Sequence, residues 1–484
     1  MHRKCSPLRP TARRLALALG ALLAAACSTA RQHEPPSIEL GAYFKEAGNW
    51  QPAQPRDAEL RGNWWAAYGD ADLDRLMPRV LTDNQDLRIA EAQYRIALAT
   101  TDAARASLFP SLNGSLAATR SRAAASSNSN SGSTRSSSPA NTVNLGLTAS
   151  WEPDLFGRLR LGVAVDRANA EAAAANRAAV MLAMQAQLAQ NYFLLRTADA
   201  KQSLLAEEIE ALDKSLLLTR NRYAAGVATR ADVAQAETQL KSTTAQGVEN
   251  RLTRAQLEHA IAVLLGVAPS ALDLAAKPPL AVRLHIPPLL PADLLERRPD
   301  VAAAERQVAA ANAQMGIAQT AFFPKLTLSA TLGQSASSFS QLFSAPARYW
   351  SLGPALAATL FDAGQREAAI SGAQATHDQA VANYRKTVLV SLQEVEDNLA
   401  ALRLLDEEIA VQQEAVSAAG VALKLTLNGY KAGTVSYLNV IAAQTAELSA
   451  RQNLLTLQGR LRTAEVALVR ALGGGWKAGD LAGP

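Results

Sequence analysis

Aromatic residues and cysteines are scarce in this sequence. Phe, Trp and Tyr make up 5% of the 484 residues, and the only cysteines are Cys5 and Cys27. The low aromatic content, together with abundant alanine, favours long and closely packed helices over a compact mixed fold. Because we expect Cys5 to be removed with an N-terminal signal, the mature chain would hold one cysteine and no intramolecular disulfide.

A strong charge asymmetry and catalytic motifs are also missing. The net charge of +5 is modest, and basic and acidic residues are interspersed without a basic stripe, which argues against nucleic-acid binding. The sequence has no phosphate-binding glycine loop and no Gly-x-Ser-x-Gly motif. Its histidines show no metal-ligand spacing: His2, His33, His259, His285 and His377. We therefore predict a protein that is not an enzyme and binds no metal and no cofactor.

The N-terminus is typical of an exported protein. Basic residues precede the apolar run Leu15–Ala26, which is too short for a permanent membrane span. We therefore expect a signal peptide over residues 1–26. The following Cys27 resembles the acylated cysteine of a bacterial lipobox, although Ala24 stands where leucine is most common. Cleavage of a plain signal peptide near Cys27 is the alternative.

The chain repeats itself at a separation of about 205 to 215 residues. The phrase RYAAGVATRADVAQAET at Arg222–Thr238 returns as GYKAGTVSYLNVIAAQT at Gly429–Thr445. Three further pairs follow the same order: DLRIAEAQ with DVAAAERQ, LFPSL with FFPKL, and DLFGRLR with TLFDAGQR. We infer an internal duplication, with one repeat over residues 81–282 and the other over 283–476. Residues 27–80 form an N-terminal segment, and residues 477–484 form a tail.

Within each repeat the hydrophobic period changes from helical to alternating and back. Alternation predicts strands at about 111–122, 141–155, 325–336 and 349–361, each near the length that crosses an outer membrane. The Ser-rich segment Ser121–Asn141 between the first two strands is expected to be an exposed loop. No later apolar run is long enough for a spanning helix, so a membrane crossing would require a β-barrel. A soluble hairpin subdomain is the alternative.

Long proline-free stretches predict helices at about 157–223, 229–265, 363–430 and 436–472. The longest would extend roughly 100 Å at 1.5 Å per residue. The duplicated phrases therefore lie at two helix–turn–helix tips, where Gly226 and Gly433 supply the turns.

Four strands per chain cannot close a membrane barrel, since the smallest have eight. The open edges therefore require oligomerisation. Two chains would provide eight strands, and three would provide twelve and a wider interior.

This arrangement resembles the TolC-like outer-membrane factors, in particular the lipoprotein NodT- or OprM-like branch. The resemblance spans the mature chain and rests on Cys27, Gly62–Leu76, Glu296–Gln307, both Phe-Pro motifs and both tip phrases. It implies a mainly α fold, with a homotrimer forming a 12-stranded β-barrel and a periplasmic α-helical tunnel. It also implies a lipid-anchored exit channel in the outer membrane, which conducts drugs or other small molecules passively. Its partners would be a periplasmic adaptor and an inner-membrane pump of the resistance-nodulation-division type.

The same resemblance implies site residues at the tips. The expected adaptor contacts are Tyr223, Gly226, Val227, Tyr430, Gly433 and Thr434, with both tyrosines packing beneath the turns. The alternative is that the glycines only cap helices. Relatives commonly close the tip with a ring of aspartates, a position that corresponds here to Asn439. A neutral amide binds divalent cations poorly, so we expect weak cation block unless Asp232 compensates.

Two other functions remain open at this point. A type I protein-secretion channel would share the fold. A periplasmic adaptor would also have long helical hairpins, but it would show one hairpin and a soluble β-domain instead of a duplicated unit.

Overall fold

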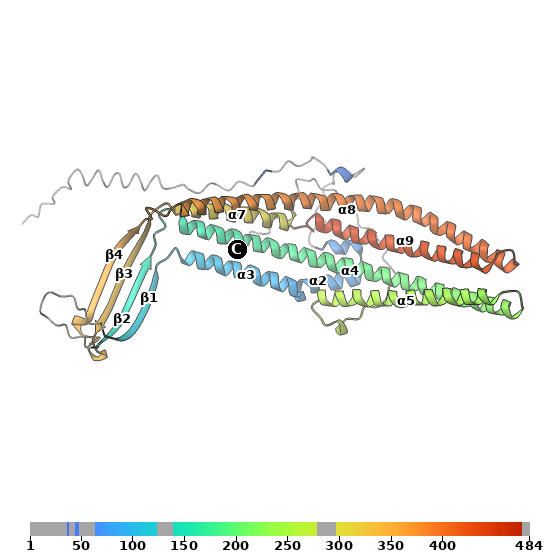
Figure 1. The fold of residues 1–484 in the computed structure, drawn as a ribbon, viewed down its shortest axis with the longest axis horizontal. Coiled ribbons are helices and arrows are strands. Elements are labelled where there is room, and N and C mark those ends of the chain that lie inside the picture. The colour runs from blue at the N-terminus through green and yellow to red at the C-terminus, as the bar shows by residue number, and fades with distance from the viewer. Residues whose placement is uncertain (1–35, 38–43, 48–62, 123–138, 278–296, 477–484) are drawn as a thin grey trace, which may run out of the picture. The chain divides into compact units, whose positions relative to one another are not determined.

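The structure is a computed structural model that describes residues 36–37, 44–47, 63–122, 139–277 and 297–476 (Figure 1). The signal peptide, Cys27, the C-terminal tail and most of the Ser-rich loop lie outside the described residues. Among the described helices, none combines the length and the hydropathy needed to cross a bilayer.

The chain divides into two compact units that cut across the sequence repeats. The strand unit comprises residues 1–36, 95–171 and 305–383, and the hairpin unit comprises residues 37–94, 172–304 and 384–484. Each repeat contributes to both units because its long helices continue from one into the other. These helices are α3 (Gln85–Ala106), α4 (Arg158–Ala224), α7 (Pro299–Thr320) and α8 (Gln365–Ala432).

The strand unit contains one antiparallel sheet in the order β1-β2-β3-β4. Its strands are β1 (Ser111–Ser121), β2 (Ala140–Trp151), β3 (Lys325–Ala336) and β4 (Arg348–Ala357). The sequence predicted that β2 and β4 would end at residues 155 and 361, but they end earlier, at Trp151 and Ala357. Pro153 lacks the N–H that a ladder needs, and Ala357 already pairs with the first residue of β3. Among the described strands, β1 pairs only with β2 and β4 only with β3.

Side chains alternate strictly across this sheet, which gives it one polar and one apolar face. A row on the polar face contains Asn113, Thr148, Thr331 and Ser351. The next row, on the apolar face, contains Leu112, Ala149, Ala330 and Leu352. Leu352 is 76% exposed and Trp350 on the same face is 75% exposed, so no described part of the chain covers the apolar face there.

The hairpin unit consists of two long helical hairpins and shorter helices packed on them. The C-terminal halves of α4 and α8 pair with α5 (Arg230–Leu264) and α9 (Tyr437–Ala471) respectively. The helix α2 (Ala71–Asp83) and a 3-10 helix at Trp64–Tyr68 pack against α4 and α9 in the largest apolar cluster. Six of the chain's aromatic residues lie in this cluster: Phe44, Trp64, Trp65, Tyr68, Tyr192 and Phe193.

Each repeat is closed at a glycine that follows its returning helix. Gly266 after α5 and Gly473 after α9 have φ values of +66° and +87°, a conformation that favours glycine. A Cβ on Gly266 would overlap the carbonyl oxygen of Asp83, and one on Gly473 would overlap that of Arg297. Both closures therefore need a residue without a side chain.

At each of these contacts, the residue just before the first long helix of the repeat (α3 or α7) adds a hydrogen bond to the end of the returning helix. The Asn84 amide nitrogen donates to the carbonyl of Leu264 at 2.9 Å, and the Arg298 guanidinium donates to the carbonyl of Ala471 at 3.1 Å. The two carbonyls are equivalent, since the repeats are offset by about 207 residues at this end. Only Arg298 also binds a carboxylate of α8, that of Glu394, at 2.7 Å.

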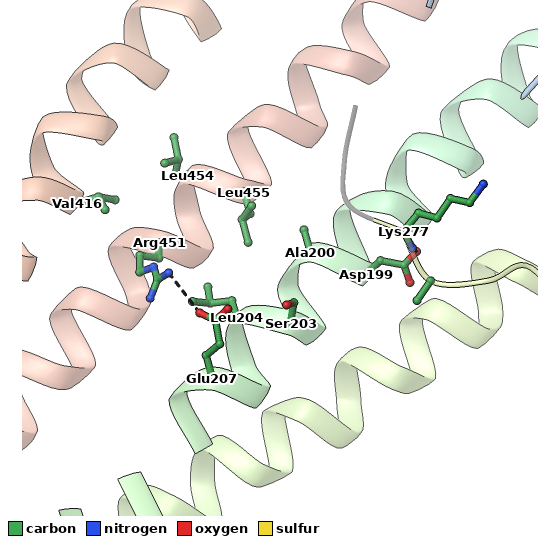
Figure 2. A pocket seen from close by; sticks show the side chains of 11 residues that line it. Asp199, Ala200, Ser203, Leu204, Glu207, Lys277, Val416, Arg451, Leu454 and Leu455 are labelled. Carbon is green, nitrogen blue, oxygen red and sulfur yellow. Dashed lines mark hydrogen bonds and ion pairs between the residues drawn. The ribbon is translucent and has the colours of Figure 1, made fainter. Parts of the chain in front are cut away.

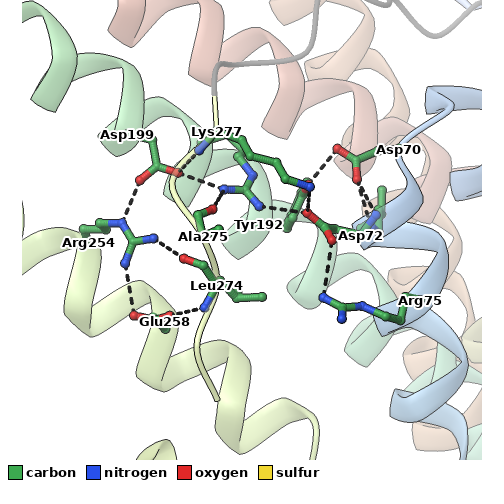
Figure 3. Close-up of polar contacts among 12 residues, drawn as sticks. Asp70, Asp72, Arg75, Tyr192, Asp199, Arg254, Glu258, Leu274, Ala275 and Lys277 are labelled. Atoms are coloured by element: carbon green, nitrogen blue, oxygen red, sulfur yellow. Dashed lines mark hydrogen bonds and ion pairs between the residues drawn. The ribbon is translucent and has the colours of Figure 1, made fainter.

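A buried charge network joins α2, α4, α5 and the chain after α5 (Figure 3). The Arg196 guanidinium donates to Asp199 at 2.9 Å and to the carbonyl of Ala275 at 2.8 Å. The Tyr192 hydroxyl donates to Asp70 at 2.6 Å. Because the Arg196 side chain is only 2% exposed, its charge must be matched by these partners.

Candidate functional site

The first tip joins α4 to α5 through a Schellman turn. The N–H of Val227 donates to the carbonyl of Arg222, and Gly226 has φ +74°. Thr229 then caps α5 in a capping box. Its side chain accepts from the N–H of Asp232, and the Asp232 carboxylate accepts from the backbone N–H and the hydroxyl of Thr229, both at 2.8 Å. One carboxylate oxygen of Asp232 is thus already used within the turn.

The second tip joins α8 to α9 with the same backbone and different side chains. Gly433 has φ +78°, and the N–H of Thr434 donates to the carbonyl of Gly429. The Thr434 hydroxyl donates to that carbonyl as well, at 3.0 Å. Ser436 begins α9 without a side-chain cap, and Asn439 is exposed. The second copy therefore lacks the charged box of the first.

The two tip glycines have no neighbour that would exclude a side chain. No heavy atom lies within 4 Å of a Cβ built on either Gly226 or Gly433, yet both have positive φ. Their helix-capping role is therefore a property of the backbone. Contact with another protein at these positions stays a prediction.

Between the two hairpins lies an apolar group, which we call the tip cluster. It contains Leu212, Leu216, Ala236, Leu240, Tyr430, Tyr437 and Val440. The rings of Tyr430 and Tyr437 are 5.3 Å apart between centroids, and the hydroxyls of Tyr437 and Ser215 are 3.2 Å apart. Burial raises the pKa of the Tyr437 phenol, so this side chain stays neutral at physiological pH.

Arg222 connects the first tip directly to the second. Its guanidinium carbon lies 4.6 Å from the centroid of the Tyr430 ring, and its Nη1 donates to the carbonyl of Lys431 at 3.4 Å. Sequence reasoning missed this role. The available signal was a difference between the copies, since Gly429 stands where the first repeat has Arg222. A Cβ at Gly429 would crowd Thr434 and Val435 at 3.2 Å.

The expectation that both tip tyrosines pack beneath the turns holds for Tyr430 and is wrong for Tyr223 within the chain. Tyr430 is 6% exposed, whereas Tyr223 is 48% exposed. The reason lies seven residues further on, where the second repeat has Tyr437 to stack on and the first has Arg230. Val227 beside Tyr223 is also exposed.

A cavity of about 520 Å³ lies between α4, α8 and α9 in the hairpin unit (Figure 2). Its lining includes Asp199, Glu207, Lys277 and Arg451, and each of these is ion-paired: Asp199 with Arg254, Lys277 with Asp72, and Arg451 with Glu207. The ammonium of Lys277 lowers the pKa of the Asp72 carboxyl by hydrogen bonding to it. These charged lining residues therefore offer a ligand no unpaired charge. Among the described residues, no group of three or more potential metal ligands comes together.

Comparisons with known proteins agree with the internal duplication. The family model for outer membrane efflux protein matches residues 76–267 and again residues 290–474. The solvent efflux pump outer membrane protein SrpC of Pseudomonas putida is 33% identical over 461 residues, which cover 94% of this chain and 97% of that protein. The pyoverdine export outer membrane protein OpmQ of Pseudomonas aeruginosa is 31% identical over 468 residues, covering 96% and 97%.

Solved structures show the same fold. The outer-membrane channel OprN superposes with a TM-score of 0.84 at 31% identity, and the match covers 93% of this chain and all of that one. The open state of the MtrE outer membrane channel of Neisseria gonorrhoeae gives a TM-score of 0.80 at 28% identity, covering 93% and 99%.

Proposed function

Because this chain belongs to the outer membrane efflux protein family, we propose that it forms the exit channel of a tripartite efflux pump, as a homotrimer. An efflux role in the outer membrane follows from the family and from its similarity to named efflux proteins and outer-membrane channels. The assembly, its partners and the residues that contact them are our proposal. It includes no enzymatic step, since passive conduction needs none.

The observation that carries the proposal is the four-stranded sheet, which has two chemically opposite faces and two edges that no other described strand pairs with. A polar row backed by an apolar row is the pattern of a wall between water and lipid. Unpaired outer strands are satisfied by closure with further copies. Three copies would provide twelve strands, with the polar face lining the lumen and the apolar face meeting lipid.

An exposed apolar stripe on α8 also supports assembly. Leu404, Val411 and Leu425 are 50%, 68% and 65% exposed, and they stand at multiples of seven residues. This spacing places them on one side of the helix, as in a coiled-coil seam. Exposed Val248 and Leu252 give α5 a shorter patch of the same kind. We infer that α8 and α5 meet neighbouring copies.

The tips are our candidate for the adaptor contact, through Tyr223, Gly226, Val227, Gly433 and Thr434, with the buried Tyr430 packing beneath the second turn. Support comes from the exposed side chains of Tyr223 and Val227 beside an open turn. Acylation of Cys27 would add an anchor in the outer membrane, and no other cofactor is proposed. Incorporation of a labelled fatty acid, lost in Cys27→Ser, tests the anchor.

Val227→Glu tests the tip contact better than a bulky residue at Gly433, where φ alone would cause strain. We expect the variant to keep its oligomeric mass and to lose crosslinking to the adaptor. Val263→Glu near the end of α5 is the matched control, because both valines are 64% exposed. Equal crosslinking in the two variants would contradict the contact.

The first experiment on the function itself is a combined mass and conductance measurement. The mature protein in detergent should have the mass of three chains and appear as a hollow threefold particle. It should also open ion-conducting channels in planar lipid bilayers. A monomer, or a trimer that conducts no current under any condition that opens related channels, would overturn the proposal.

A further inference from the structure

The polar face of the sheet carries a single aromatic side chain among the described strands, that of Tyr349 on β4. Otherwise this face presents small and hydroxyl- or amide-bearing residues, with Lys325 as its one charged residue in the strands. Tyr349 follows the β3–β4 connection directly, so it lies at the end of the sheet away from the strand–helix junctions. It is 40% exposed.

Tyr349 belongs to a row that crosses all four strands. The pairing partners are Ser115 on β1, Gly146 on β2, Gly333 on β3 and Tyr349 on β4. The two central positions of the row thus have no side chains. Together they form a shallow track across β3 and β2, with Tyr349 at one end and Ser115 at the other.

The Tyr349 ring lies in this track. A Cβ on Gly333 would be 2.5 Å from Cζ of the ring, which no real structure tolerates. A Cβ on Gly146 would be 3.3 Å from the Tyr349 hydroxyl oxygen. The side chain therefore extends from β4 over β3 to β2, flat against the sheet. Any side chain at Gly333 would force the ring away from the sheet surface.

We propose that Tyr349 gives the outer part of the channel its affinity for aromatic solutes, and that Gly333 and Gly146 keep its ring flat and out of the lumen. The inference rests on the proposed function, which makes the polar face the channel lining. In the flat position the ring leaves the lumen open and shows one π face to passing solute. Three copies give three such faces at one level of a lining that is otherwise hydroxylated. Aromatic and cationic solutes are the class that a π face attracts.

The test is single-channel conductance of purified trimers in planar bilayers. Gly333→Ala should lift the ring into the lumen and lower the conductance. The double variant Gly333→Ala/Tyr349→Ala should restore the conductance, since the loss depends on the ring. Gly353→Ala is the matched control on the same face of the same sheet, because no heavy atom lies within 4 Å of its Cβ position. It should conduct like the wild type.

Block by tetraphenylphosphonium, an aromatic cation, reports the affinity. Tyr349→Ala should weaken this block by about two- to fivefold, the change expected when an exposed cation–π contact is lost. Tyr349→Phe keeps the π face and should keep the block. Both variants leave the glycines intact, so they remain informative if Gly333→Ala fails to assemble. In that case the milder Gly146→Ala replaces it.

The outcomes separate this inference from the proposed function. Wild-type trimers that conduct, with tetraphenylphosphonium block unchanged by Tyr349→Ala, would overturn the role of Tyr349 and leave the channel intact. A fall in conductance that persists in the double variant would assign the effect to the backbone and would also overturn it. Failure of the wild type to conduct would count against the proposed function.

Discussion

The two helical tips have the same backbone and opposite chemistry. Both turns use a glycine at positive φ, and in both the returning helix begins four residues after that glycine. The first is fixed by a charged capping box and leaves Tyr223 exposed, whereas the second buries Tyr430 against Tyr437. The duplication therefore preserved the path of the chain, and later substitutions divided the tasks. The first tip offers side chains to solvent, and the second holds the pair of hairpins together.

The comparison is tested most strongly at the two tyrosines. Tyr430→Ala should lower the free energy of unfolding by about 3 kcal/mol, because it empties a buried aromatic site. Tyr223→Ala should cost about 0.5 kcal/mol or less, as for an exposed side chain. Thermal unfolding of the trimer in detergent measures both. Equal losses would show that assembly buries Tyr223 as well, and the asymmetry of the single chain would not extend to the trimer.

Substitution of the glycines that follow α5 and α9 should destabilise both repeats equally, in contrast to the substitutions at the tips. Gly266→Ala and Gly473→Ala each combine positive φ with overlap of a carbonyl, and each should cost roughly 2–3 kcal/mol. Gly69→Ala is the control, since its φ is +62° and its Cβ position is free of neighbours. It should show the strain of φ alone, about 1 kcal/mol. If Gly69→Ala lowers the unfolding temperature as much as the other two, the carbonyl overlap contributes nothing.

Arg298 and Asn84 measure how far the closures have diverged. Arg298→Ala removes a bond to Ala471 and the ion pairs to Asp300 and Glu394, and should cost about 2 kcal/mol. Asn84→Ala removes a neutral bond to Leu264 and a cap on α3, and should cost about 1 kcal/mol. High salt should reduce the difference between the two losses of unfolding free energy, because only the Arg298 variant loses partly exposed ion pairs. The same gap at all salt concentrations would argue against a charge effect.

The smallest expected effect is on current. Wild-type channels should show weak block by divalent cations, since Asn439 is neutral and Asp232 is engaged in its capping box. Asn439→Asp should introduce block with an affinity on the order of 10⁻³ M, typical of weak carboxylate sites. Single-channel recording with Ca²⁺ measures this. Strong block of the wild type that Asn439→Ala abolishes would contradict the premise.

The sequence predicted the elements of this fold well because their signals are periodic and local. Alternation located all four strands, and the proline-free stretches located α4 and α8 to within about two residues. The tip glycines were also found, because each interrupts a long helical pattern. What depends on one chain segment meeting another was beyond reach. Arg222 stacks on a residue more than 200 positions away, and the only hint in the sequence was that Gly429 occupies the equivalent position in the second repeat.

Differences between the side chains of the two copies explain what the sequence did not show. The Asp232 carboxylate accepts from two donors of Thr229 at 2.8 Å, and its role at a pore constriction stays a prediction. Tyr223 was expected to pack like Tyr430, but its stacking partner is absent from the first copy. The glycine track under Tyr349 joins β2 and β3, which come from different repeats, so their register was not available from either repeat alone.

The track under Tyr349 also restricts the order in which this protein can change. A substitution at Gly333 is harmful while the tyrosine is present and harmless once a smaller residue has replaced it. The tyrosine can be lost first, whereas the glycine cannot. Gly146, Gly333 and Tyr349 therefore form an epistatic set with a preferred order of mutation. A gene library that varies these positions one at a time would misjudge how much sequence variation the sheet accepts.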